Sequence, residues 1–206
     1  MIARFKRFLG DLRNVISLYP DVPSIARRMF TTNSFDGIMA SIGVNVGGFS
    51  HNGDPMSLAL SIIGGGVSMG FISGMLGVYL SERAERLREV REVEHKVASS
   101  LKNTIYYKAA RLIPVYIALW SGVGIVLFPT LIALPYIAAA VLGIPILVAY
   151  LASLAVSLAS LAGLGAYLAK VSGESVPMGV ARALGMGLAA IVMVLIVKNL
   201  LGAAIT

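Results

Sequence analysis

Three groups of side chains in this sequence have the chemistry to bind a cation. Asp36 is a carboxylate at the start of a stretch, 37–53, that has no formal charge. Met69 follows Ser68 in a glycine-rich run, and its thioether is a soft ligand that prefers softer metals to Mg²⁺ or Ca²⁺. Four glutamates share one face of a predicted helix: Glu82, Glu85, Glu89 and Glu92. Their hard oxygens suit Mn²⁺, Mg²⁺ and Ca²⁺ and accept Fe²⁺.

Asp36 has two interpretations. An acid in the first turn of a helix suits the helix dipole, so Asp36 would belong to a helix N-terminus capped by Thr32, Asn33 or Ser34. Alternatively, it is a ligand for a cation or a proton at the cytoplasmic mouth of a pathway. A carboxylate in a membrane is costly to leave unpaired and is therefore a candidate for function.

The glutamates also have two interpretations. They would form a solvated helix face with the i,i+4 pairs Glu82–Arg86 and Glu92–Lys96. Alternatively, they form a carboxylate stripe that gathers divalent cations before they enter the membrane. His95 stands beside them and is either a further nitrogen ligand or a solvated side chain.

The composition shows what kind of protein must position these groups. Of 206 residues, 57% are hydrophobic and 13% are charged, against about 25% charged in an average soluble domain. The formal net charge is +7, and the chain has no cysteine. This excludes an ordinary soluble enzyme, a disulfide scaffold and a thiolate metal site. We therefore expect a membrane protein that is not an enzyme, with no permanently bound cofactor and no nucleic-acid partner.

Uncharged intervals locate the membrane spans. They cover 55–81, 112–169 and 183–197. With 37–53 they predict an all-α integral membrane protein with five transmembrane helices, at about 33–50, 56–81, 112–132, 135–169 and 178–201. Pro129 and Pro135 mark the expected turn of the central hairpin. The fourth interval exceeds one bilayer, so its helix is tilted, broken at Pro145 or partly outside.

The basic residues predict the orientation. They gather in 1–28, 82–111 and 170–182, whereas 51–54 and 129–135 have none. The N-terminus is therefore expected in the cytoplasm and the C-terminus outside. Apolar residues at helical spacing predict an amphipathic interfacial helix that Pro20 and Pro23 end: Ile2, Phe5, Leu9, Leu12 and Ile16. The expected parts are 1–30, this helix and its linker, and 31–206, the membrane domain with 82–111 as a charged cytoplasmic helical extension.

Glycines at a spacing of four residues predict close helix packing. Gly43 and Gly47 lie in the first span, and Gly66, Gly70 and Gly74 in the second. Small residues at this spacing let two helix backbones approach closely. We therefore expect the first two spans to pack tightly together, with three polar residues near their interface, lining a pathway: Ser41, Asn45 and Ser68.

Three segments resemble the vacuolar iron transporter family and the related yeast vacuolar iron/manganese importers. They are Asn33-Ser34-Phe35-Asp36-Gly37-Ile38; Gly64-Gly65-Gly66-Val67-Ser68-Met69-Gly70 with Gly77-Val78-Tyr79-Leu80; and the glycine-led last span after Gly173-Glu174-Ser175. The resemblance covers 30–95 and 163–201. It implies a homodimer in the lipid bilayer whose first spans line a central pathway, and antiport of divalent metal ions against protons.

The resemblance also implies site residues. Asp36 falls on the pathway aspartate of the family, and Met69 on its pathway methionine. Met75 is the alternative methionine, because its distance to Tyr79 fits the family better. The family's iron-transporting members have a helical metal-binding domain between spans two and three. Here that domain is absent or reduced to the glutamates of 82–92.

These observations predict a transporter that exports Fe²⁺ or Mn²⁺ from the cytoplasm in exchange for protons. The metal would be a transported substrate and not a resident cofactor. The membrane would be the plasma membrane in a prokaryote and a vacuole-type membrane in a eukaryote. The alternative is a non-transporting membrane protein whose basic cytoplasmic segments bind anionic lipid or a protein partner.

Overall fold

The computed structural model describes residues 10, 12–49 and 53–205, without the side chains of Met69, Phe71 and 201–205. All regular elements in this part of the chain are helices. They are α2 (Val22–Gly48), α3 (Pro55–Val67), the π-helix η1 (Ser68–Met75), α4 (Leu76–Val97), α5 (Ile105–Leu142), α6 (Ile146–Ser172) and α7 (Val176–Ile205). A short helix at 12–18 precedes α2. The all-α fold class is confirmed for the described residues.

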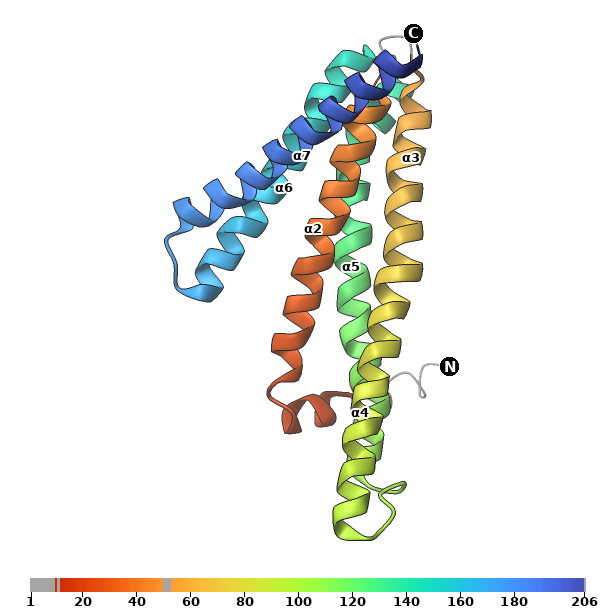
Figure 1. The fold of residues 1–206 in the computed structure, drawn as a ribbon, viewed down its shortest axis with the longest axis vertical. Helices are drawn as coiled ribbons and strands as arrows, with labels where there is room; N and C mark the ends of the chain where they lie inside the picture. The colour runs from red at the N-terminus through yellow and green to blue at the C-terminus, as the bar shows by residue number, and fades with distance from the viewer. Residues whose placement is uncertain (1–9, 11, 50–52, 206) are drawn as a thin grey trace.

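Two long helices form the axis of the molecule. α3, η1 and α4 make one continuous helix of 43 residues, and α5 runs antiparallel beside it (Figure 1). α2 packs along α5 (Figure 1). The α6–α7 hairpin diverges from α2, and the gap between them widens toward the loop that joins α6 to α7 (Figure 1). The α4–α5 turn and the start of α2 lie toward one end of the bundle, which we call the charged end. The α5–α6 turn and the C-terminus lie at the other.

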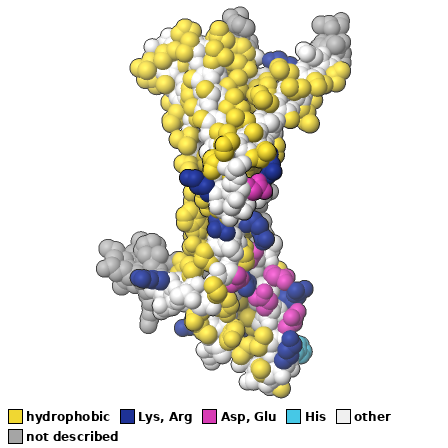
Figure 2. Space-filling model, turned by 90° about the vertical axis from the view of Figure 1, so that its left-hand side faces the viewer, with side chains coloured by type: hydrophobic (Ala, Val, Ile, Leu, Met, Phe, Trp, Pro, Cys, Tyr) yellow, Lys and Arg dark blue, Asp and Glu magenta, His cyan; other side chains and the backbone are white. Residues whose placement is uncertain are grey.

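Within the described residues, four helices are long and apolar enough to cross a membrane: Pro55–Val97, Ile105–Leu142, Ile146–Ser172 and Val176–Leu200. This is the build of a multi-pass membrane protein. Figure 2 shows apolar side chains over the upper part of the surface and most charged side chains over the lower part. α2 is long enough at 27 residues but is not apolar enough to be counted with these four. Five spans and their orientation therefore stay predictions.

The predicted turn of the central hairpin was wrong. α5 continues through Pro129 and Pro135 to Leu142, and the chain reverses at Gly143, which has a φ of +68°. A left-handed glycine after the last turn, with Pro145 two residues later, is a common helix C-terminus. Proline is tolerated inside a membrane helix because neighbouring helices and local adjustments satisfy the freed backbone groups. Of the alternatives for the fourth span, the break at Pro145 is the one observed.

Gly66 and Gly70 of the second span pack against α5, and not against α2 as expected, whereas Gly74 lies near Asn33 of α2 as well as Ile125 of α5. A Cβ at Gly66 would lie 2.7 Å from Pro129, and one at Gly70 would overlap the side chain of Ile125. Gly37 of α2 meets the same Pro129, at 3.3 Å from its ideal Cβ. Around a Cβ at Gly43 there is no atom within 4 Å. Pro129 of α5 is therefore in close contact with both α2 and α3.

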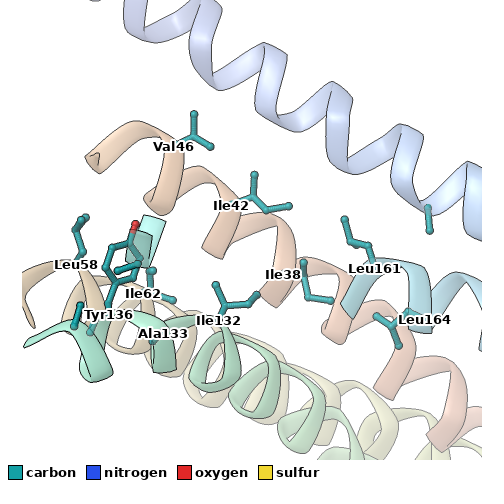
Figure 3. Packing of buried hydrophobic residues seen from close by; sticks show 14 residues of the cluster. Ile38, Ile42, Val46, Leu58, Ile62, Ile132, Ala133, Tyr136, Leu161 and Leu164 are labelled. Carbon is teal, nitrogen blue, oxygen red and sulfur yellow. The ribbon is translucent and has the colours of Figure 1, made fainter. Parts of the chain in front are cut away.

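Two apolar clusters hold the bundle together. The larger one joins α2, α3, α5, α6 and α7, and Figure 3 shows its labelled side chains between these helices. The smaller one packs the helix at 12–18 and the start of α2 on α5; it contains Val15, Val22, Ala26, Ala109, Ile113 and Ile117. Because α2 begins at Val22 with Pro23 in its first turn, residues 22–30 belong to this long helix. Ile2, Phe5 and Leu9 lie outside the described residues.

Candidate functional site

Asp36 lines a cavity of about 740 Å³ between three helices. α2 contributes Asp36 together with Asn33, Met39 and Ala40; η1 contributes Ser68, Ser73 and Gly74; α5 contributes Ile125. The carboxylate is exposed and is the only charged group of this wall. Asp36 takes part in none of the ion pairs found among the described residues. It is therefore accessible to a cation or a proton.

Asp36 does not cap a helix. α2 begins at Val22 with Asp21 before it, so Asp36 lies in the middle of a helix of 27 residues. Two of the proposed capping side chains have other partners. Ser34 donates to the backbone oxygen of Phe30, and Asn33 donates to Ser121 of α5. The capping interpretation of Asp36 is wrong because the helix extends eleven residues further toward the N-terminus than the expected start at 33.

The opposite wall of the cavity is a π-helix. η1 interrupts the long helix over Ser68–Met75, beside the close contact of Gly70 with Ile125. A π-helix is rare, and short π segments inside α-helices are frequent at functional sites. Asn33 donates to the hydroxyl of Ser121, which donates in turn to the carbonyl oxygen of Gly74 at 3.4 Å. This bridge fixes α2 against η1 at the edge of the cavity.

The two candidate methionines have different places. Met69 lies in η1, directly after the cavity-lining Ser68, and its side chain is outside the described part. Met75 ends η1 and packs on α5, where its sulfur would lie 3.1 Å from a Cβ at Gly122. The structure thus places Met75 in a helix–helix contact. Ser68 is the predicted pathway residue that shares a cavity with Asp36.

Ser41 and Asn45 lie away from this cavity, in the buried interior of the bundle. Ser41 donates to the carbonyl oxygen of Gly37 at 2.7 Å. Asn45 donates to Ser153 of α6 at 2.9 Å and accepts from the hydroxyl of Tyr136 of α5 at 2.5 Å. Every side chain of this network is fully buried, and its polar groups are satisfied within the protein.

The glutamates lie on α4, beyond the apolar part of the long helix, and most pair with arginines. Arg88 binds Glu85 at 2.7 Å and Glu92 at 3.6 Å, and Arg86 binds Glu89 at 3.1 Å. These pairs differ from the two expected ones. Among the described residues, no three His, Asp or Glu side chains come together in a group that could hold a metal ion. The arginines neutralise much of the charge that the stripe would offer to a cation.

Arg86 makes two further contacts that the sequence did not indicate. Its guanidinium also binds Asp21 at 3.0 Å and lies over the ring of Tyr19 at 5.9 Å. The Arg86 side chain is only 11% exposed, whereas Arg88 is 66% exposed. The linker before α2 is thereby fixed to α4. Burial raises the pKa of the Tyr19 hydroxyl above its usual value.

Glu94 and His95 lie in the last turn of α4. Glu94 accepts the backbone N–H of Leu101 at 2.7 Å and so closes the turn that leads to α5. His95 is exposed. Glu94 therefore has a structural role in this turn.

Sequence reasoning missed Ser73, Ser121 and Tyr136. All three stand in uncharged stretches, where a single hydroxyl gives no sign of its partner. The partners of Ser121 and Tyr136 are 88 and 91 residues away in the chain, so only the packed helices bring them together.

The chain matches no family model, no curated protein and no solved structure.

Proposed function

We propose that this chain is a transporter that moves a divalent transition metal, Fe²⁺ or Mn²⁺, out of the cytoplasm in exchange for protons. The observation that carries the proposal is the position of Asp36. It is an exposed carboxylate without an ion-pair partner among the described residues, in a cavity bounded by a π-helical stretch of a membrane-spanning helix. Such a group is expensive in a membrane unless it binds something.

The chemistry of the wall supports a cation that competes with a proton. A carboxylate binds either a metal ion or a proton, so release of one accompanies binding of the other. Asn33, Ser68 and Ser73 add neutral oxygens beside it, and hard oxygen ligands suit Mn²⁺ and accept Fe²⁺. In this proposal Met69, which follows Ser68, supplies the soft ligand that favours a transition metal over Mg²⁺.

The proposed topology has five spans, with α2 as the first. α2 is 27 residues long, about 40 Å at 1.5 Å per residue, which is sufficient to cross the hydrocarbon core. Thr31, Ser34, Ser41 and Asn45 of α2 are buried and Asp36 faces the cavity, which supports a span shielded by the four apolar helices. The loops that carry the bases would lie in the cytoplasm.

The proposed assembly is a homodimer. One chain offers a single carboxylate to the cavity, and a second copy across a two-fold axis would add another. Asp36, Ala40 and Gly43 share one face of α2, at i, i+4 and i+7. Because no atom lies within 4 Å of a Cβ at Gly43, this face has room for a neighbouring helix.

Metal-dependent proton flux in proteoliposomes tests the proposal. Vesicles with an acidic interior and a trapped pH-sensitive dye receive Mn²⁺, or Fe²⁺ under reducing conditions, on the outside. We expect the internal pH to rise only when metal is added and only when the protein is present. Equal rates in protein-free vesicles would contradict transport and favour the alternative, a membrane protein that binds anionic lipid or a partner.

A further inference from the structure

A second cavity, of about 290 Å³, opens between α2, α5 and α6 near the charged end. We call it the aromatic groove; its lining residues are Pro23, Ala26, Arg27, Phe30, Tyr116, Trp120 and Tyr167. Trp120 stands edge-on to Phe30 and to Tyr116, at ring centroid distances of 6.0 and 6.4 Å. The groove is thus an aromatic wall with one guanidinium beside it.

The groove lies where the apolar surface gives way to charge. Tyr167 is one turn before Lys170 on α6, and Arg27 is in the second turn of α2. Trp120 and Tyr167 are 44% and 40% exposed, and both stand on helices that are long and apolar enough to cross a membrane. Tryptophan and tyrosine are enriched at the membrane–water interface, where their rings sit at the level of the lipid headgroups.

Arg27 and Arg28 have different surroundings. No ion pair among the described residues includes Arg27. Arg28 does not line the groove and is close enough to Glu82 of α4 for their charges to interact. The groove therefore holds a cation whose charge is not balanced by an acid of the described chain. An anion with an apolar body complements both this charge and the aromatic wall.

We propose that the aromatic groove binds one anionic glycerophospholipid, with its phosphate at Arg27 and an acyl chain along Phe30 and Trp120. A basic pocket between membrane helices on the headgroup level is the kind of site that holds such lipids. A free phosphate would leave the aromatic wall empty, so lipid is the better occupant. The proposal goes beyond transport and does not depend on it.

Trp120 makes the site directly measurable, because it is the only tryptophan of the sequence. The fluorescence of Trp120 is recorded for the protein in two kinds of mixed micelle. One contains phosphatidylglycerol and the other phosphatidylcholine, both brominated on the acyl chains and present at equal mole fractions. Bromine quenches tryptophan only at contact. One basic residue near a membrane surface contributes about 1 kcal/mol toward an anionic lipid, so we expect roughly a fivefold preference for phosphatidylglycerol.

Two matched variants decide whether the groove is responsible. Arg27→Gln should abolish the preference, whereas Arg28→Gln removes the same charge from the next position of α2 and should keep it. Glycerol phosphate at millimolar concentration should not reverse the quenching. The proposal is overturned if wild-type protein shows no preference, if both variants lose it equally, or if glycerol phosphate displaces the brominated lipid.

Discussion

The hydroxyl of Tyr136 donates a 2.5 Å hydrogen bond to the side-chain oxygen of Asn45, at a point where both residues are fully buried. Asn45 in turn donates to Ser153, which donates to the carbonyl oxygen of Ile132 at 2.8 Å. Three helices, α2, α5 and α6, are thereby joined by one satisfied polar network. Such a network specifies how helices pack where apolar side chains alone allow several arrangements.

Tyr136→Phe should destabilise the protein by about 1–3 kcal/mol, because it leaves the buried oxygen of Asn45 without its donor. The check is thermal unfolding of the purified protein in detergent. Tyr106→Phe is the matched control, since it removes a hydroxyl from a side chain that is 52% exposed. Equal unfolding temperatures for the two variants would contradict a role of the network in stability.

Gly66→Ala should destabilise the bundle by about 1–3 kcal/mol, because the new methyl group would lie 2.7 Å from the ring of Pro129. Gly64→Ala makes the same change two residues earlier, where no atom lies within 4 Å of the ideal Cβ. Alanine favours a helix over glycine by up to about 1 kcal/mol, so Gly64→Ala should be neutral or stabilising. Equal changes of the unfolding temperature in Gly66→Ala and Gly64→Ala would contradict the close contact of Gly66 with Pro129.

Arg86→Gln should destabilise the charged end by about 1 kcal/mol, since it removes hydrogen bonds to Asp21 and Glu89 from a buried guanidinium. Arg88→Gln removes a guanidinium that is 66% exposed and should cost less than about 0.5 kcal/mol. Hydrogen exchange of the linker before α2 is the second readout. We expect faster exchange in Arg86→Gln alone; no difference between the variants would contradict the fixation of this linker.

Asp54 should make stability depend on pH. Hydrogen bonds from the hydroxyl and the backbone N–H of Ser57 hold the pKa of Asp54 below its usual range. A lowered pKa in the folded state stabilises above the unfolded value, about 3.9, and this contribution is lost as the pH falls through the folded value. Wild-type protein should therefore unfold at a higher temperature than Asp54→Asn at pH 7, and this difference should shrink as the pH falls below about 3.9. A difference that is independent of pH would contradict this cap.

How much the sequence predicts depends on the range of the interaction. The apolar helices and the charged α4 were predictable because the pattern of apolar and charged residues that identifies each lies within one continuous stretch of sequence. The turn at Gly143 was placed too early, because two prolines in an uncharged stretch resemble a loop while the neighbouring helices keep α5 intact. The partners of Asn45 were not predictable, since they come from residues 91 and 108 positions away.

Asp36 illustrates the same limit. A polar run from Thr31 to Asp36 has the composition of a helix start, and only tertiary packing shows that α2 continues through it. The hydroxyl groups of Thr31 and Ser34 donate hydrogen bonds to backbone oxygens of α2. These side chains therefore do not compete with the helical hydrogen bonds of the backbone. The carboxylate is then left to face the cavity.

The central claim is that Asp36 exchanges a metal ion for a proton, and one comparison tests it most directly. Metal-driven proton flux is measured in proteoliposomes for wild type, Asp36→Asn and Asp54→Asn. Both variants replace an acid by its amide, but Asp54 lies outside the cavity and asparagine is itself a good capping residue. We predict that Asp36→Asn loses flux at least about tenfold while Asp54→Asn retains it, with equal amounts of folded protein. Wild-type flux in Asp36→Asn would contradict the account.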